Sequence, residues 1–131
     1  MDFAFVCDYA DAGGPKINAL GVGFDTIFAQ TVPWTQPLFF FVAQLSASVA
    51  EVGQKDLVIR LIDADGADIA EIHGSFPIAQ PIAGVEAKAR IAVQFAGVTF
   101  PQYGVYALHL VVGGNELHVI PLTVTSPPAT A

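Results

Sequence analysis

The chain of 131 residues is 53% hydrophobic and only 13% charged, and its 12 acidic and 5 basic residues give a formal net charge of -7 at pH 7. This length fits one domain with a single core, and so large an apolar fraction favours self-association into a homo-oligomer. The negative charge repels nucleic-acid phosphates and anionic membrane surfaces, which argues against both as partners.

The expected elements are short and follow one another closely. Each is rich in Val, Ile, Phe and Leu and is bounded by Gly, Pro or Asp, and no window repeats at the helical period. This pattern predicts an all-β fold, namely an antiparallel β-sandwich, immunoglobulin-like or a related Greek key, with about eight or nine strands. We expect one domain over 1–125 and a flexible tail over 126–131. The predicted strands are 2–9, 16–22, 25–30, 37–48, 56–64, 67–75, 86–96, 104–112 and 115–125.

The N-terminal segment MDFAFVCDYA has no basic residue, and no apolar run in the chain reaches the roughly 20 residues that span a bilayer. Cys7 is the only cysteine, so no intrachain disulfide can form. Both features predict a cytoplasmic location. Sequence spacing places none of His73, His109 and His118 beside Cys7 to activate its thiol, so we expect a buried structural cysteine and no enzyme activity.

The segment Leu38-Phe39-Phe40-Phe41-Val42-Ala43 is apolar on both faces of the strand that it predicts. Such a strand must be covered twice, by the core and by another layer, which makes Phe39 and Phe41 candidate interaction residues. Trp34, in the predicted loop 31–37, is the candidate exposed aromatic contact. Apolar residues on outward strand faces extend the expected association surface, and these are Val58, Ile62, Ile69, Val111 and Ile120.

The stretch IDADGADI at 62–69 carries three aspartates and a glycine within six residues. A two-residue turn at Asp65-Gly66 is favoured. The resulting register pairs Ile59 with Ile72, Arg60 with Glu71, Leu61 with Ala70 and Ile62 with Ile69. A calcium loop would need glycine at its sixth position and glutamate at its twelfth, where this stretch has glycine fourth and Gly74 twelfth. A weak calcium site lined by the aspartates is the alternative to the turn.

A second tight turn is predicted at Gly113-Gly114. It pairs Leu110 with Leu117, Leu108 with Val119 and His109 with His118. Directly opposed residues have Cβ atoms about 4.5 to 5.5 Å apart, close enough for two imidazoles to bind a zinc or copper ion. A zinc site needs at least three protein ligands, and the sequence places no third one here. The alternative is a polar histidine pair beside Glu116, and no cofactor is predicted.

Two resemblances rest on particular motifs. The segment 102–106, Gln-Tyr-Gly-Val-Tyr, resembles the tyrosine corner of immunoglobulin-type sandwiches, where a tyrosine hydroxyl bonds back to the backbone. A second set of segments runs over nearly the whole chain, namely Cys7-Asp8-Tyr9-Ala10, Lys16-Ile17-Asn18, Gly21-Val22-Gly23-Phe24-Asp25, Ile59-Arg60-Leu61-Ile62-Asp63 and Phe100-Pro101 through Tyr106. With these segments the sequence resembles a family of small uncharacterised bacterial proteins. That resemblance implies a small β-sandwich and carries over no catalytic residues.

These features together predict a non-enzymatic module for self-assembly or for binding another protein. The rival hypothesis is a metal-dependent binder or an enzyme centred on His109 and His118. The fold alone does not decide between them, because one β-sandwich can carry many functions.

Overall fold

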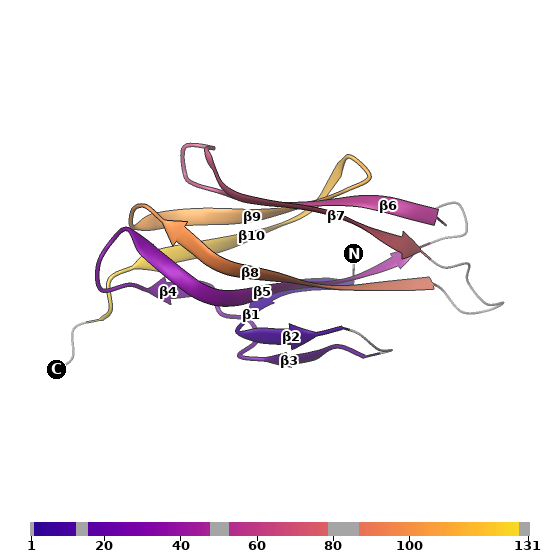
Figure 1. Cartoon of the computed structure of the whole chain (residues 1–131), viewed down its shortest axis with the longest axis horizontal. Coiled ribbons are helices and arrows are strands. Elements are labelled where there is room, and N and C mark those ends of the chain that lie inside the picture. Colours follow the sequence, from indigo (N-terminus) through magenta and orange to yellow (C-terminus); the bar gives the residue numbers. More distant parts are fainter. Residues whose placement is uncertain (1, 13–15, 48–52, 79–86, 129–131) are drawn as a thin grey trace.

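The computed structural model describes residues 2–12, 16–47, 53–78 and 87–128, and its regular elements in these ranges are all strands (Figure 1). The all-β prediction is confirmed. These ranges contain no helix that is long and apolar enough to cross a membrane. The strands are β1 (Phe3–Cys7), β2 (Tyr9–Asp11), β3 (Asn18–Leu20), β4 (Thr26–Phe28), β5 (Trp34–Ala47), β6 (Gly53–Ile62), β7 (Asp68–Ile78), β8 (Ala87–Phe100), β9 (Gly104–Val112) and β10 (Asn115–Thr125).

The strands form three sheets; side chains from two of them share one core, and the third sheet, of two strands, lies outside it (Figure 1). The smaller sheet has the order β1-β5-β8 and the larger has the order β4-β10-β9-β6-β7. Neighbouring strands are antiparallel, except that β4 runs parallel to β10. The remaining strands, β2 and β3, form a short antiparallel ribbon that lies against the outer face of the smaller sheet.

Two predicted strand boundaries are wrong for identifiable reasons. The predicted strand 2–9 ends at Cys7, because the chain leaves the smaller sheet at Asp8 and pairs with β3 as β2. Strand β5 begins at Trp34, inside the predicted loop, because Trp34 pairs with Phe100; the pairing skips Pro37, which has no N–H to donate. The predicted strand ends at 48 and 86 lie outside the described residues.

Both faces of β5 are buried over residues 39–43, as the sequence predicts, and the chain itself supplies both covers. One face packs Phe39 and Phe41 into the main core, where each is 0% exposed. The other face packs Phe40 and Val42 under the β2–β3 ribbon, in a second cluster with Cys7. Phe39 and Phe41 are therefore core residues, and their prediction as interaction residues is wrong: core and interface draw on the same apolar side chains.

Trp34 and two of the outward apolar residues also lie elsewhere than predicted. Trp34 is partly buried against the main core, and its indole N–H donates to Oε1 of Gln36 over 2.9 Å. Ile69 and Ile120 pack against the same core. The remaining outward residues are half-buried and stay outside that core cluster, and these are Val58, Ile62 and Val111.

The aspartate-rich stretch forms a turn, with one residue more than predicted. The carbonyl of Asp63 accepts from the Gly66 N–H over 3.1 Å, and the Asp63 carboxylate accepts from the N–H groups of Asp65 and Ala67, each over 2.9 Å. Gly66 has a φ of +86°, as in a three-residue hairpin loop that ends in a left-handed glycine. The pairs Ile59–Ile72, Arg60–Glu71 and Leu61–Ala70 are confirmed, whereas Ile62 pairs with Asp68 across a bulge.

The Gly113-Gly114 turn is confirmed, since both glycines have positive φ, +57° and +83°. Its predicted register holds for only two residue pairs, because a bulge between Glu116 and His118 shifts the rest of β10. His118 is therefore opposite Leu110, while His109 is opposite Val119. Successive residues of a strand point to opposite faces, so His109 and His118 occupy opposite faces of the sheet. The prediction that they are cross-strand neighbours is wrong.

A hydrogen-bond network around Asp2 links the N-terminal end of β1 to the rest of its sheet. The Asp2 carboxylate accepts from Gln44 (2.8 Å), Ser46 (2.7 Å) and Lys88 (3.0 Å). These hydrogen bonds, together with the charge of Lys88, hold the pKa of Asp2 well below its ordinary value of 3.8. Because the folded pKa lies below the unfolded one, the contribution of Asp2 to stability is complete above that ordinary value and is lost as the pH falls further.

As the pH is lowered below about 4, we expect the urea concentration at the unfolding midpoint to decrease. In the variant Asp2→Asn this midpoint should depend less steeply on pH over the same range. Asp65→Asn, at an exposed turn position, is the control and should leave the slope unchanged. Parallel midpoint curves for Asp2→Asn and the unmodified protein would contradict the network's role.

Candidate functional site

A cleft of about 590 Å³ lies beside the chain segment that links β3 to β4. Its walls combine two of the sequence motifs, since Asp8 comes from one and the turn 21–23 from the other. None of the described residues that line the cleft is a Lys or an Arg. Beyond Asp8 and the turn, it is lined by Phe24, Thr26, Ile27, Phe28 and Gln36.

Backbone hydrogen bonds hold this turn against the end of β1. The Asp8 N–H donates to the carbonyl of Leu20 (3.0 Å), and the Gly23 N–H donates to the carbonyl of Val6 (2.8 Å). Gly21 has a φ of +66°, in the left-handed region that favours glycine. A methyl group on Gly21 would lie 2.0 Å from Oδ2 of Asp8. The Asp8 carboxylate therefore rests directly on Gly21, at the rim of the cleft.

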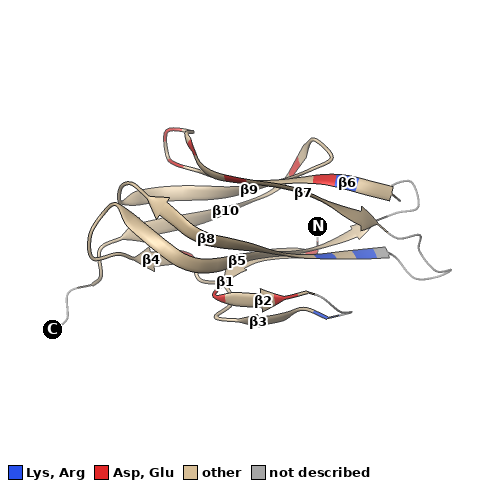
Figure 2. Cartoon of the chain, in the orientation of Figure 1, with Lys and Arg blue, Asp and Glu red and all other residues tan. Residues whose placement is uncertain are grey.

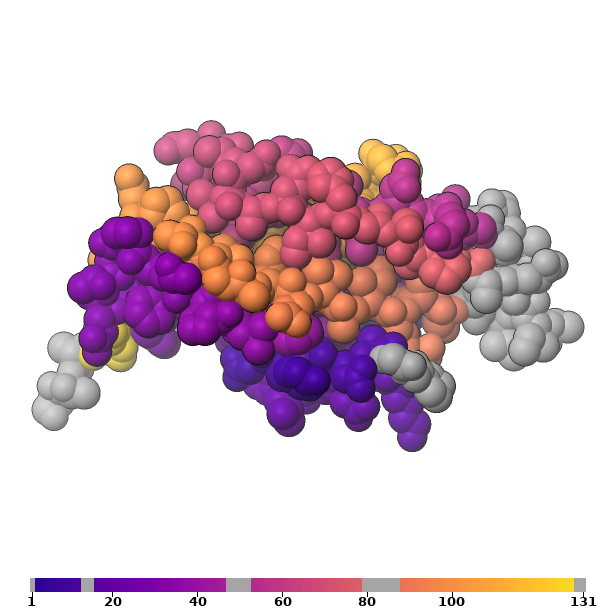
Figure 3. Space-filling view, in the orientation of Figure 1, coloured from indigo at the N-terminus to yellow at the C-terminus, as the bar shows by residue number. Residues whose placement is uncertain are grey.

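Exposed apolar side chains lie in this cleft and on the ribbon next to it in the chain. Among the large hydrophobic residues that the structure describes, only Tyr9 (51%), Leu20 (68%), Val22 (56%), Phe28 (55%) and Val105 (54%) are more than half exposed. Val22 and Phe28 line the cleft. Tyr9 and Leu20 are paired on the adjoining β2–β3 ribbon, which forms a ridge in Figure 3. We call the surface formed by Asp8, Tyr9, Leu20, Val22 and Phe28 the docking face.

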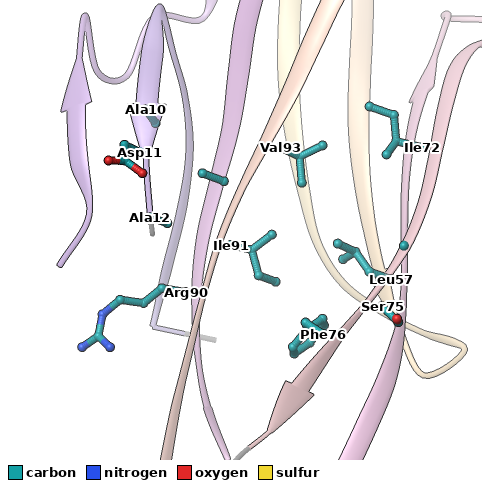
Figure 4. A pocket seen from close by; sticks show the side chains of 12 residues that line it. Ala10, Asp11, Ala12, Leu57, Ile72, Ser75, Phe76, Arg90, Ile91 and Val93 are labelled. Carbon is teal, nitrogen blue, oxygen red and sulfur yellow. The ribbon is translucent and has the colours of Figure 1, made fainter. Parts of the chain in front are cut away.

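A second hollow, of about 500 Å³, follows the edge of β8 near β7 and the end of β2 (Figure 4). Leu57 and Ile91 in its wall are buried core residues, and Ile72, Phe76 and Val93 pack against the same core. The Arg90 side chain points away from these apolar groups (Figure 4). This hollow is therefore the open seam between the two sheets, and Asp11 and Arg90 are the charged residues among its lining.

The predicted metal ligands are not brought together. Nδ1 of His109 contacts Oε1 of Glu116, whereas His118 lies on the opposite face. Of the aspartates at the turn, Asp63 accepts from the turn backbone, and Asp68 forms an ion pair with Arg60 over 2.9 Å. Within the described ranges, no group of three or more His, Cys, Asp or Glu side chains could hold a metal ion.

The hydrogen bond expected for a tyrosine corner is present. The Tyr106 hydroxyl donates to the carbonyl of Gln102 over 2.6 Å, as the motif predicts. By contrast, the contact between Asp8 and Gly21 was missed by sequence reasoning. The two residues lie in motifs that the family resemblance singled out, but nothing in either motif shows that they meet.

The Cys7 thiol is enclosed in the second core cluster. It is 0% exposed, and its Sγ donates to the carbonyl of Tyr9 over 3.4 Å. Burial, and then the nearby negative charge of Asp8, raise the pKa of the thiol. We expect the native protein to react with a thiol reagent at neutral pH much more slowly than the unfolded chain, because the thiol is buried and the thiolate is the reactive form. Labelling of native protein at the unfolded rate would contradict this.

A single family match covers all the strands that the structure describes. Residues 2–125 match a family of unknown function, DUF6941. No curated protein matches the chain. The family match spans every strand in the described ranges and includes the docking face, the Asp8–Gly21 contact and the Tyr106 hydrogen bond. The chain therefore belongs to the family of unknown function DUF6941.

Proposed function

We propose that this chain is a non-enzymatic protein-binding module, built on an immunoglobulin-like β-sandwich, and that it binds its partner through the docking face. The sandwich assignment is supported by the two sheets that share one core and by the hydrogen bond from Tyr106 to Gln102. The cytoplasmic location expected from the sequence stays part of this proposal.

The observation that carries the proposal is the gathering of exposed apolar side chains. Four of the five large hydrophobic residues that are more than half exposed in the described ranges belong to the docking face. Scattered single apolar residues are normal on a protein surface, whereas a contiguous group marks an interaction site. Tyr9 and Phe28 are aromatic, a residue class that is enriched at protein interfaces.

The other predicted roles have less support. Self-association was expected partly because β5 is apolar on both faces, but the β2–β3 ribbon covers the second face. A metal-dependent role centred on His109 and His118 required them to be neighbours, and the bulge in β10 separates them. We therefore propose a different protein as the partner, with a second copy of this chain as the competing outcome.

Photo-crosslinking in the source cell tests the proposal. A benzophenone amino acid placed at position 22 should give a discrete adduct with another protein, and the same group at position 105 should not. Val22 and Val105 have matched exposures of 56% and 54%, so the pair controls for accessibility alone.

Binding of the purified partner should then weaken about tenfold or more in Val22→Ser and Phe28→Ser, but not in Val105→Ser. A covalent dimer of this chain would support self-association in place of a separate partner. Equal adducts from the two positions, or none from position 22, would refute the docking face.

A further inference from the structure

The docking face combines apolar groups with one unpaired negative charge. The Asp8 side chain is exposed, and its carboxylate forms no hydrogen bond or ion pair with any residue that the structure describes. Lys16 is the only basic residue between positions 1 and 54, and it does not line the cleft. Figure 2 shows acidic residues at both ends of β2, while the basic residues of the larger strands lie on β6 and β8.

This arrangement selects for a cation on the partner. A bound segment would shield Asp8 from water, and an anion that loses water without gaining a counter-charge is costly. Lys and Arg side chains meet both demands, since their apolar stems lie along hydrophobic surface while their charged ends reach a carboxylate. Val22 and Phe28 offer that hydrophobic surface next to Asp8.

A second copy of this chain does not supply the missing charge. A two-fold symmetric dimer on the docking face would place the same patch against itself, so two copies of Asp8 would approach without a cation. Each copy also carries a net charge of -7, which adds long-range repulsion. The charge pattern thus favours a different, basic partner.

We infer that the docking face binds a protein segment in which a Lys or Arg side chain is flanked by apolar residues, with Asp8 accepting the positive charge. This inference rests on the proposed protein-binding function and deepens it, because it states the chemistry of the partner segment. Gly21 is the positioning residue, since the Asp8 carboxylate rests against its α-carbon.

A positional-scanning library of acetylated hexapeptides tests the inference with the full-length chain. At each position the library holds every residue type in turn, and binding is read by fluorescence polarisation. We expect Lys or Arg to be selected at one position and apolar residues beside it. The best peptide should bind Asp8→Asn about fivefold more weakly, and about 0.5 M salt should remove most of this difference.

Amide chemical shifts locate the peptide, and they should change at position 8 and over 20–28. Asp65→Asn, which removes an exposed carboxylate outside the docking face, is the matched control and should bind like the unmodified chain. Selection of no basic residue, or equal binding to Asp8→Asn, would overturn the inference.

Different results would refute the docking role and the basic partner segment. Adducts at position 22 combined with no basic preference in the library would retain the docking role and refute the basic segment. Absence of adducts at position 22 would refute the docking role itself, and with it the inference.

Discussion

Replacing Phe39 by alanine should lower the free energy of unfolding by about 3–5 kcal/mol, which is a large part of the roughly 5–15 kcal/mol that stabilises a typical domain. Phe39 is 0% exposed, and its ring stacks on Phe95 with 4.8 Å between centroids and 2° between planes. The loss combines the transfer of apolar surface with the cavity left between the two sheets.

Urea denaturation monitored by circular dichroism measures this effect. Phe39→Leu keeps most of the volume and should cost less, and the exposed control Val105→Ala should change stability by no more than about 0.5 kcal/mol. The experiment also distinguishes a core residue from an interface residue, because the loss of stability on replacing a core residue does not depend on protein concentration. A loss for Phe39→Ala that shrinks on dilution of both proteins would return Phe39 to an interface.

Replacing Gly21 by alanine should cost about 2–3 kcal/mol of stability and weaken binding at the docking face. The φ of +66° alone costs an L-residue about 1–2 kcal/mol. The new methyl group would also lie 2.0 Å from Oδ2 and 3.1 Å from Cβ of Asp8. The carboxylate can rotate away, but the Asp8 Cβ is fixed to the backbone, so the turn itself must shift.

Gly23→Ala is the matched control, because its φ is +83° and no atom lies within 4 Å of the added methyl group. It should show only the backbone cost of about 1–2 kcal/mol. In the Asp8→Gly background the collision is absent, so adding Gly21→Ala there should cost no more than Gly23→Ala costs in the unmodified chain. Equal destabilisation by Gly21→Ala and Gly23→Ala would show that Asp8 does not rest on Gly21.

Several features follow from local sequence alone. Alternating and doubly apolar segments predict strands, because side chains on a strand repeat every second residue. The Gly113-Gly114 turn is predictable because only glycine enters the left-handed region at low cost. The burial of Cys7 follows from its apolar strand, and the hydroxyl contact of Tyr106 follows from a recognised motif.

Other features depend on contacts between residues far apart in the chain. Whether Phe39 and Phe41 face a core or a partner is undecided in the sequence, since both environments exclude water in the same way. The covering of Phe40 and Val42 by β2 and β3 required the ribbon to fold back over β5.

The histidine pair and the Asp8–Gly21 contact also depend on tertiary structure more than on local sequence. The bulge in β10 that separates His109 from His118 adds a single residue to one strand, and no side chain in the segment signals it. The seating of Asp8 on Gly21 joins two turns whose separate sequences are ordinary. Sequence by itself therefore determined the all-β class and the positions of the tight turns, because these depend on neighbouring residues. Only the tertiary structure decided which faces are covered and which exposed apolar residues lie together, because these depend on packing between distant segments.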